Sequence, residues 1–243
     1  MSRILVVAII VLLGAFTLWA CNPQAAKGTD TGKTGQPAGT ADPKATGDMK
    51  APDPPKTEAA KDTYALAKEG WVNFKDPKFA GATKNVSCNS CHPYGGKDTS
   101  PQPKDKLSLI GQAKTFPKVV PMAGDKPVTL VEMINFCITN PLGGKALAEK
   151  DPLMVSMVEF HKILEPRTFE ADALPVINAK CGGCHTGDAP VTGLKLADKQ
   201  TAIADTEKIR VAVDSGTMPK TGKLTDKELL TLIVWATAEI DKK

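Results

Sequence analysis

The five-residue pattern Cys-x-x-Cys-His occurs twice in this chain of 243 residues. The two copies are Cys88-Asn-Ser-Cys91-His92 and Cys181-Gly-Gly-Cys184-His185. Two thiols at this spacing reach the two vinyl groups of one porphyrin, and the histidine that follows can ligate its iron from the proximal side. The pattern therefore predicts two covalently bound c-type haems.

Two other chemistries also use paired cysteines. Four thiols could bind a structural zinc ion, but zinc leaves unexplained why a histidine directly follows each pair. A redox-active dithiol is expected within a βαβ unit, and no strand pattern of useful length surrounds either motif. Haem attachment explains both the cysteines and the histidines.

When histidine holds a haem iron on one side, the ligand on the other side sets the reduction potential and decides whether small molecules can bind. In the second half, Met218 lies in the loop Gly216-Thr-Met-Pro, and it is the only methionine after His185. Methionine often serves only as core filler. Its Gly-x-Met-Pro loop resembles the loop in which class I cytochromes carry their distal methionine. This resemblance implies that Met218 is the distal ligand of the second haem.

The first half has no methionine in the corresponding loop, residues 140–151. Met154 and Met157 lie on a predicted helix, where packing is the simpler role. Four candidates for the distal ligand remain, and their chemistry alone does not choose among them: Met122, Met133, Cys137 and His161.

The cysteine count adds weight to one of them. Of six cysteines, four are assigned to haem and Cys21 to a lipid, which leaves Cys137 without a partner for an intramolecular disulfide. An unpaired thiol outside the cytoplasm is exposed to oxidation. The two roles open to Cys137 are that of a small buried apolar residue and that of an iron ligand.

The N-terminus has the features of an export signal, with Arg3 followed by an apolar run from Ile4 to Ala20. The run ends in Leu18-Trp-Ala-Cys21, which resembles a lipobox. We therefore expect a signal peptide over residues 1–21 and a bacterial lipoprotein anchored through Cys21, in the periplasm or on the outer surface. The alternative is an uncleaved anchor, for which the run lies at the lower limit of length.

Residues 22–61 contain no aromatic residue and are rich in Gly, Pro, Ala, Thr and Lys, which predicts a disordered tether. The net charge is +4, and arginine occurs only at positions 3, 167 and 210, so we expect no nucleic-acid partner. Scattered lysines usually form a solvated surface, and they also suit an acidic redox partner protein.

Helical signals surround both motifs. In the first half, Tyr64, Ala67, Trp71 and Phe74 recur at helical spacing, and Gly70 offers a notch where a second helix can cross closely. The predicted crossing helix has Asp151 as N-cap and Pro152 at its first position, and it ends before Pro166. Its expected buried face is Leu153, Met157, Phe160 and Leu164.

Two capping boxes mark further helix starts, Thr129–Glu132 before Cys137 and Thr225–Glu228 before the C-terminal helix with Trp235. The sequence thus predicts an all-α protein with one haem domain over residues 62–166 and another over residues 167–243. The whole resembles two class I cytochrome c folds in tandem.

The first half also resembles a more particular family, the cytochrome domain shared by thiosulfate dehydrogenases and the dihaem subunit of the bacterial sulfur-oxidation system. The resemblance covers about residues 71 to 164. The matching features are Cys88-Asn-Ser-Cys-His-Pro-Tyr-Gly-Gly96, Phe116-Pro117, Thr129-Leu-x-Glu-x-Ile-Asn-x-Cys137 and Gly144-Lys-Ala-Leu147. It implies that Cys137 ligates the first haem through its thiolate, that sulfur substrates are handled there, and that a His/Met haem passes electrons onward.

One departure from that family bears on catalysis. Its enzymes typically place basic residues, arginine included, around the ligating cysteine. This chain has no arginine between Arg3 and Arg167. Only lysines, which act as point charges, could bind a sulfur oxyanion there, namely Lys84, Lys97, Lys114 and Lys145. We therefore expect a membrane-tethered dihaem electron carrier, with a thiosulfate dehydrogenase-like oxidoreductase as the alternative. Whether the chain is an enzyme is left open by the sequence.

Overall fold

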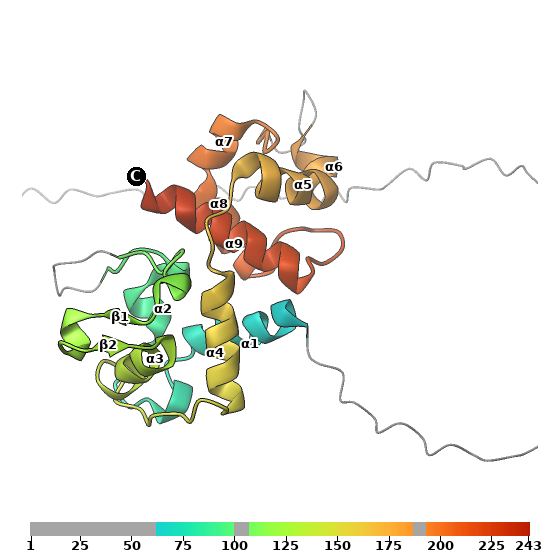
Figure 1. Ribbon diagram of the computed structural model, residues 1–243. Helices are drawn as coiled ribbons and strands as arrows, with labels where there is room; N and C mark the ends of the chain where they lie inside the picture. Colours follow the sequence, from blue (N-terminus) through green and yellow to red (C-terminus); the bar gives the residue numbers. More distant parts are fainter. Residues whose placement is uncertain (1–61, 100–106, 187–192) are drawn as a thin grey trace, which may run out of the picture. The chain divides into compact units, whose positions relative to one another are not determined.

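The computed structural model describes residues 62–99, 107–186 and 193–243, which are mostly helical (Figure 1). This agrees with the predicted all-α class. The predicted signal peptide, Cys21 and the predicted tether lie outside the described residues. None of the helices in the described ranges is long and apolar enough to cross a membrane.

The first half contains the helices α1 (Thr63–Lys75), α2 (Cys88–Cys91), α3 (Leu130–Thr139) and α4 (Pro152–Ile163). Short 3₁₀ turns join them: η1 (Phe79–Gly81), η2 (Pro93–Gly95), η3 (Ala113–Thr115) and η4 (Pro121–Ala123). Two short antiparallel strands, β1 (Lys118–Val119) and β2 (Pro127–Val128), pair Lys118 with Val128. This ribbon was not expected, because two-residue strands are too short to show alternation.

In the second half, α5 (Leu174–Val176) lies between the π-helical turns η5 (Phe169–Ala173) and η6 (Ile177–Cys181). The remaining helices are α6 (Gly182–His185), α7 (Lys199–Ala204), α8 (Thr206–Asp214) and α9 (Asp226–Asp241).

Helices α1 and α4 cross at the predicted glycine (Figure 1). A Cβ atom on Gly70 would lie 2.1 Å from the carbonyl oxygen of Ser156, so only glycine allows this approach. The rings of Trp71 and Phe74 pack on Phe160, with centroids 5.5 and 5.1 Å away. Helix α4 begins as expected, with the Asp151 side chain accepting a hydrogen bond from the N–H of Leu153. The side chain of Asp62, for which no role was predicted, caps α1 in the same way.

The predicted buried face of α4 is wrong at one position. Leu153 is 40% exposed, whereas Met154 beside it is fully buried. Leu153 lies in the first turn, next to the Asp151 cap, and the angle at which α4 meets α1 turns Met154 inward instead. Met157, Phe160 and Leu164 are fully buried as predicted.

Helix α9 forms the centre of the second half. Thr225 and Glu228 make the expected capping box, and residues 229–236 are all buried. Trp235 is fully buried against Phe169, with ring centroids 5.7 Å apart, and α8 packs along α9. Buried residues of both halves belong to one connected hydrophobic cluster. The division into two haem domains at residue 166 stays a prediction.

Candidate cofactor sites at the two Cys-x-x-Cys-His motifs

The first motif forms the short helix α2, with His92 directly after it. Ser87 and Ser90 cap the helix reciprocally, so the two cysteines are held at its ends. The Nδ1 atom of His92 lies 3.2 Å from the carbonyl oxygen of Gly96. A carbonyl can only accept, so Nδ1 carries the hydrogen and Nε2 keeps its lone pair for a metal.

The second motif has the same arrangement from a different local structure. Its cysteines stand at the end of η6 and within α6, and His185 is the last residue of α6, 9% exposed. Nδ1 of His185 lies 3.3 Å from the carbonyl oxygen of Leu194, and the backbone N–H of Leu196 donates to the carbonyl of His185 at 2.7 Å. Nδ1 of this imidazole, too, carries the hydrogen of the contact, so Nε2 is the nitrogen that could ligate a metal.

Three thiols of the first half lie within electrostatic range of one another. Burial raises the pKa of Cys88 to about 12, and the proximity of Cys137 adds to the rise. Burial likewise raises the pKa of Cys137 to about 11, followed by the effects of Cys91 and Asp98. The structure thus brings Cys137 close to the cysteines of the first motif, and the raised pKa values keep these thiols protonated and unreactive.

The helix that presents Cys137 is fixed at its start and in its middle. Its N-terminus has the predicted capping box, in which Glu132 accepts from the backbone N–H of Thr129 at 2.7 Å. In its middle, the Asn135 amide donates to the carbonyl of Leu147 at 2.9 Å and accepts from the N–H of Leu147 at 2.8 Å. This two-way bond ties the loop after α3 back onto the helix. Sequence reasoning gave Asn135 no role, although its place two residues before Cys137 was a signal.

The other predicted distal ligands of the first half differ in placement. Met122 is 64% exposed on η4, while Met133 is half-buried on α3, one turn before Cys137. Met154 and Met157 are fully buried in the core, as the packing role predicts. This leaves Cys137, Met133 and His161 as side chains that reach the interior near the motif.

His161 is the strongest rival of Cys137. Its Nδ1 donates to the carbonyl of Met157 at 2.8 Å, so its Nε2 also keeps a lone pair. Burial lowers its pKa to about 4; the hydrogen bond to Met157 opposes this shift, and the proximity of His92 adds to it. Both Cys137 and His161 therefore lie near the motif, and the assignment of the distal ligand stays a prediction.

Met218 follows α8 in a loop that is anchored on that helix. Its backbone N–H donates to the carbonyl of Ala212 at 3.1 Å, and the hydroxyl of Thr217 donates to the same carbonyl at 3.1 Å. The side chain is half-buried. These two hydrogen bonds fix the loop relative to the end of α8.

The residues present fit two c-type haems. Haem iron takes only one protein ligand from each side, because the porphyrin supplies the rest. The described residues contain no group of three or more His, Cys, Asp or Glu side chains that could hold a metal ion by themselves. The buried N–H of Trp235 has no acceptor within the described ranges, and a haem carboxylate is an acceptor of the required kind.

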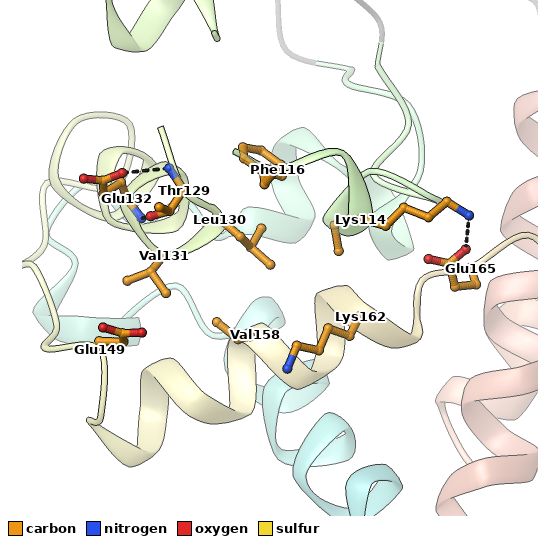
Figure 2. A pocket seen from close by; sticks show the side chains of 11 residues that line it. Lys114, Phe116, Thr129, Leu130, Val131, Glu132, Glu149, Val158, Lys162 and Glu165 are labelled. Atoms are coloured by element: carbon orange, nitrogen blue, oxygen red, sulfur yellow. Dashed lines mark hydrogen bonds and ion pairs between the residues drawn. The ribbon is translucent and has the colours of Figure 1, made fainter. Parts of the chain in front are cut away.

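A cavity of about 600 Å³ opens between the start of α3 and the middle of α4 (Figure 2). Leu130, Val131 and Val158 give it an apolar floor. Two lysines on its rim are already paired, Lys114 with Glu165 at 2.8 Å and Lys162 with Glu159 at 2.7 Å. Neither the motif histidine nor the cysteines line it. Because both lysines on its rim already pair with glutamates, they attract an anion only weakly.

The comparison with known proteins adds no relative. The sequence matches no family model, and the search of curated proteins gives no significant match. The resemblance to sulfur-oxidising cytochromes therefore depends on the motif residues alone.

Proposed function

We propose that the protein is a dihaem c-type cytochrome that carries electrons between redox partner proteins outside the cytoplasm, tethered to a membrane by a lipid on Cys21. The observation that supports this best is the common hydrogen bonding of the two motif histidines. Each donates its Nδ1 hydrogen to a backbone carbonyl, Gly96 for His92 and Leu194 for His185. These bonds orient the two rings, and Nε2 is the nitrogen of each ring that could ligate iron.

When bound, c-type haem would supply one-electron oxidation and reduction at each site. The chain's own residues attach it through Cys88, Cys91, Cys181 and Cys184, and they hold the iron from the proximal side through His92 and His185. On the distal side we propose Cys137 in the first half and Met218 in the second. A thiolate donor stabilises ferric iron and a thioether favours ferrous iron, so electrons would pass from the first site to the second.

The test is the haem content of the protein secreted by a host that matures c-type cytochromes. Mass spectrometry of the intact chain is expected to show two covalent haems. Cys88→Ala/Cys91→Ala is expected to lose one haem, and Cys181→Ala/Cys184→Ala to lose the other. A chain that matures without any covalent haem would refute the proposal.

The ligands are tested by spectroscopy of the oxidised protein. We expect two low-spin ferric EPR signals, and Cys137→Met should remove the one of the His/thiolate type. His161→Gln is the matched variant and should leave that signal in place. Loss of the signal in His161→Gln instead would give the distal position to His161.

A second candidate function, a thiosulfate dehydrogenase-like oxidoreductase, is favoured by one further observation. The ammonium group of Lys84 donates to the carbonyl of Asn140 at 2.6 Å, just past the end of the helix that holds Cys137. Lys84 is exposed and has two more hydrogens to offer an anion. A cation thus lies one turn of chain from the proposed ligand, where the sequence offers no arginine.

This reaction joins two thiosulfate ions into tetrathionate and releases two electrons, one for each haem. Addition of thiosulfate to the oxidised protein should then reduce the haems, and Lys84→Gln should weaken the rate about tenfold, with Lys78→Gln as control on the same exposed stretch. Without reduction by thiosulfate, the carrier function stands and the enzyme function is refuted.

A further inference from the structure

The loop that follows the first motif packs against the second half of the chain. Tyr94, two residues after His92, contacts two large side chains. The ring centroid of Trp71 is 5.4 Å from that of Tyr94, and the guanidinium carbon of Arg210 lies 4.0 Å from the Tyr94 ring centroid. Arg210 belongs to α8, so the second half provides one wall of this stack.

Contacts within the second half hold Arg210 in this position. It is 6% exposed, and it donates to the carboxylate of Glu207 at 2.5 Å and to the hydroxyl of Thr237 at 3.4 Å. A guanidinium held over an aromatic face in a buried place gains a cation–π attraction that is stronger than at an exposed site. Arg210 therefore fixes Tyr94 relative to α8 and α9.

One turn further along α8, Asp214 makes a second connection. Its Oδ1 accepts from the indole N–H of Trp71 at 2.8 Å and from the ammonium group of Lys75 at 2.7 Å. Residues i and i+4 of a helix lie on the same face, so Arg210 and Asp214 together hold Tyr94 and α1.

The third connection reaches the residue that orients His92. The N–H of Lys97 donates to Oδ1 of Asp241 at 3.1 Å, and a Cβ atom on Gly96 would lie 2.9 Å from that same oxygen. Gly96 is the residue whose carbonyl accepts the Nδ1 hydrogen of His92. The far side of Tyr94 is fixed as well, because its N–H donates at 2.7 Å to the side chain of Asn89 inside the first motif.

We propose that Arg210 and Asp241, from the second half, are positioning residues for His92 of the first site. They hold the loop Tyr94–Lys97, and this loop sets the orientation of the imidazole through the Gly96 carbonyl. Outer hydrogen bonds of this kind tune the basicity and direction of a ligating histidine. The reduction potential of the first haem therefore depends on residues that are distant in sequence and lie in the other half. This inference rests on the proposed function.

The test uses the full-length haem-loaded protein and three variants in the second half. Arg210→Gln and Asp241→Ala are expected to change the EPR signal of the first haem. They should shift its reduction equilibrium about tenfold, which is 59 mV for one electron. Arg210→Lys keeps the charge but loses the planar stacking, and it should give an intermediate shift. Lys208→Gln, on the exposed side of α8, is the control and should leave the EPR signal and the reduction potential of the first haem unchanged.

The outcome that overturns the inference is equally specific. If the first haem keeps its signal and potential in both Arg210→Gln and Asp241→Ala, or if the second haem alone responds, the proposed coupling is absent. Should Arg210→Gln fail to fold, Asp241→Ala decides, because Asp241 lies near the C-terminus and outside the core.

A second readout separates this inference from the proposed function. The backbone amide resonances of residues 94–97 report the docking of the loop whether or not haem is attached. They should move in Asp241→Ala and stay in place in Lys208→Gln. If the protein carries no haem but these resonances move in Asp241→Ala, the cytochrome function is refuted and the docking of the loop stands. If the resonances do not move in Asp241→Ala, the docking itself is refuted.

Discussion

The two Cys-x-x-Cys-His motifs differ in what surrounds them. Around the first lie two half-buried side chains besides those of the motif, Cys137 and His161, and burial shifts the pKa of both. The second half is organised by α9, an apolar helix, and offers only the half-buried Met218 from a loop. Cys137 and His161 can bind a metal or transfer a proton, whereas the apolar residues of α9 can mainly exclude water from the second site. Under the second candidate function, thiosulfate oxidation belongs to the first site and onward electron transfer to the second.

The largest effect is expected where α1 crosses α4. In Gly70→Ala the new Cβ would meet the Ser156 carbonyl, which is backbone and can yield only if the helices separate. We expect a loss of about 3 kcal/mol of unfolding free energy. Val72→Ala, at a position 54% exposed on the same helix, should change it by less than about 0.5 kcal/mol. Urea unfolding measures both, and equal values would contradict the close crossing.

The next effect concerns pH and the histidine found only around the first site. Burial lowers the pKa of His161 from 6.5 to about 4, so the fold favours the neutral ring. Below pH 6.5 the unfolded chain binds a proton that the folded chain does not, and stability falls until about pH 4. The slope is at most about 1.4 kcal/mol per pH unit.

Unfolding curves between pH 7 and pH 4 check this expectation. His161→Gln should flatten the pH dependence in that range. An unchanged slope in His161→Gln would show that other groups cause it.

The two buried tryptophans sharpen the comparison further. The indole N–H of Trp71 donates to Asp214, whereas that of Trp235 has no acceptor among the described residues. Trp71→Phe should therefore cost about 1–2 kcal/mol beyond the lost ring area. Trp235→Phe should cost less without haem and more with haem attached, when a haem carboxylate can accept. A cost of Trp235→Phe that does not depend on haem would remove this support for the second site.

The smallest effects separate two lysine ion pairs. Lys75 shares the carboxylate of Asp214, whose side chain is 14% exposed, and Lys75→Gln should cost about 1 kcal/mol. Lys114 has a side chain 66% exposed and pairs with Glu165 on the rim of the cavity. Lys114→Gln should therefore cost less than about 0.5 kcal/mol. Thermal unfolding at low and high salt should show the order, and the reverse order would contradict the docking of α8 on α1.

Local signals in the sequence determined much of this protein. Helices α3, α4 and α9 begin where their capping residues predict, because a cap needs only a side chain and the backbone of the next turn. The notch at Gly70 also followed from the sequence, since a glycine on a buried helical face leaves room for a close crossing.

Only the tertiary structure decided which of these pieces meet. Trp71 and Asp214 are 143 positions apart, and no local pattern pairs them. The same holds for Tyr94 with Arg210, for the approach of Cys137 to Cys88, and for the turn that buries Met154 in place of Leu153. Each depends on the angle at which helices pack and on the loops that this packing closes. Spacing along the chain placed the two attachment motifs, and packing between distant segments decided what surrounds each of them.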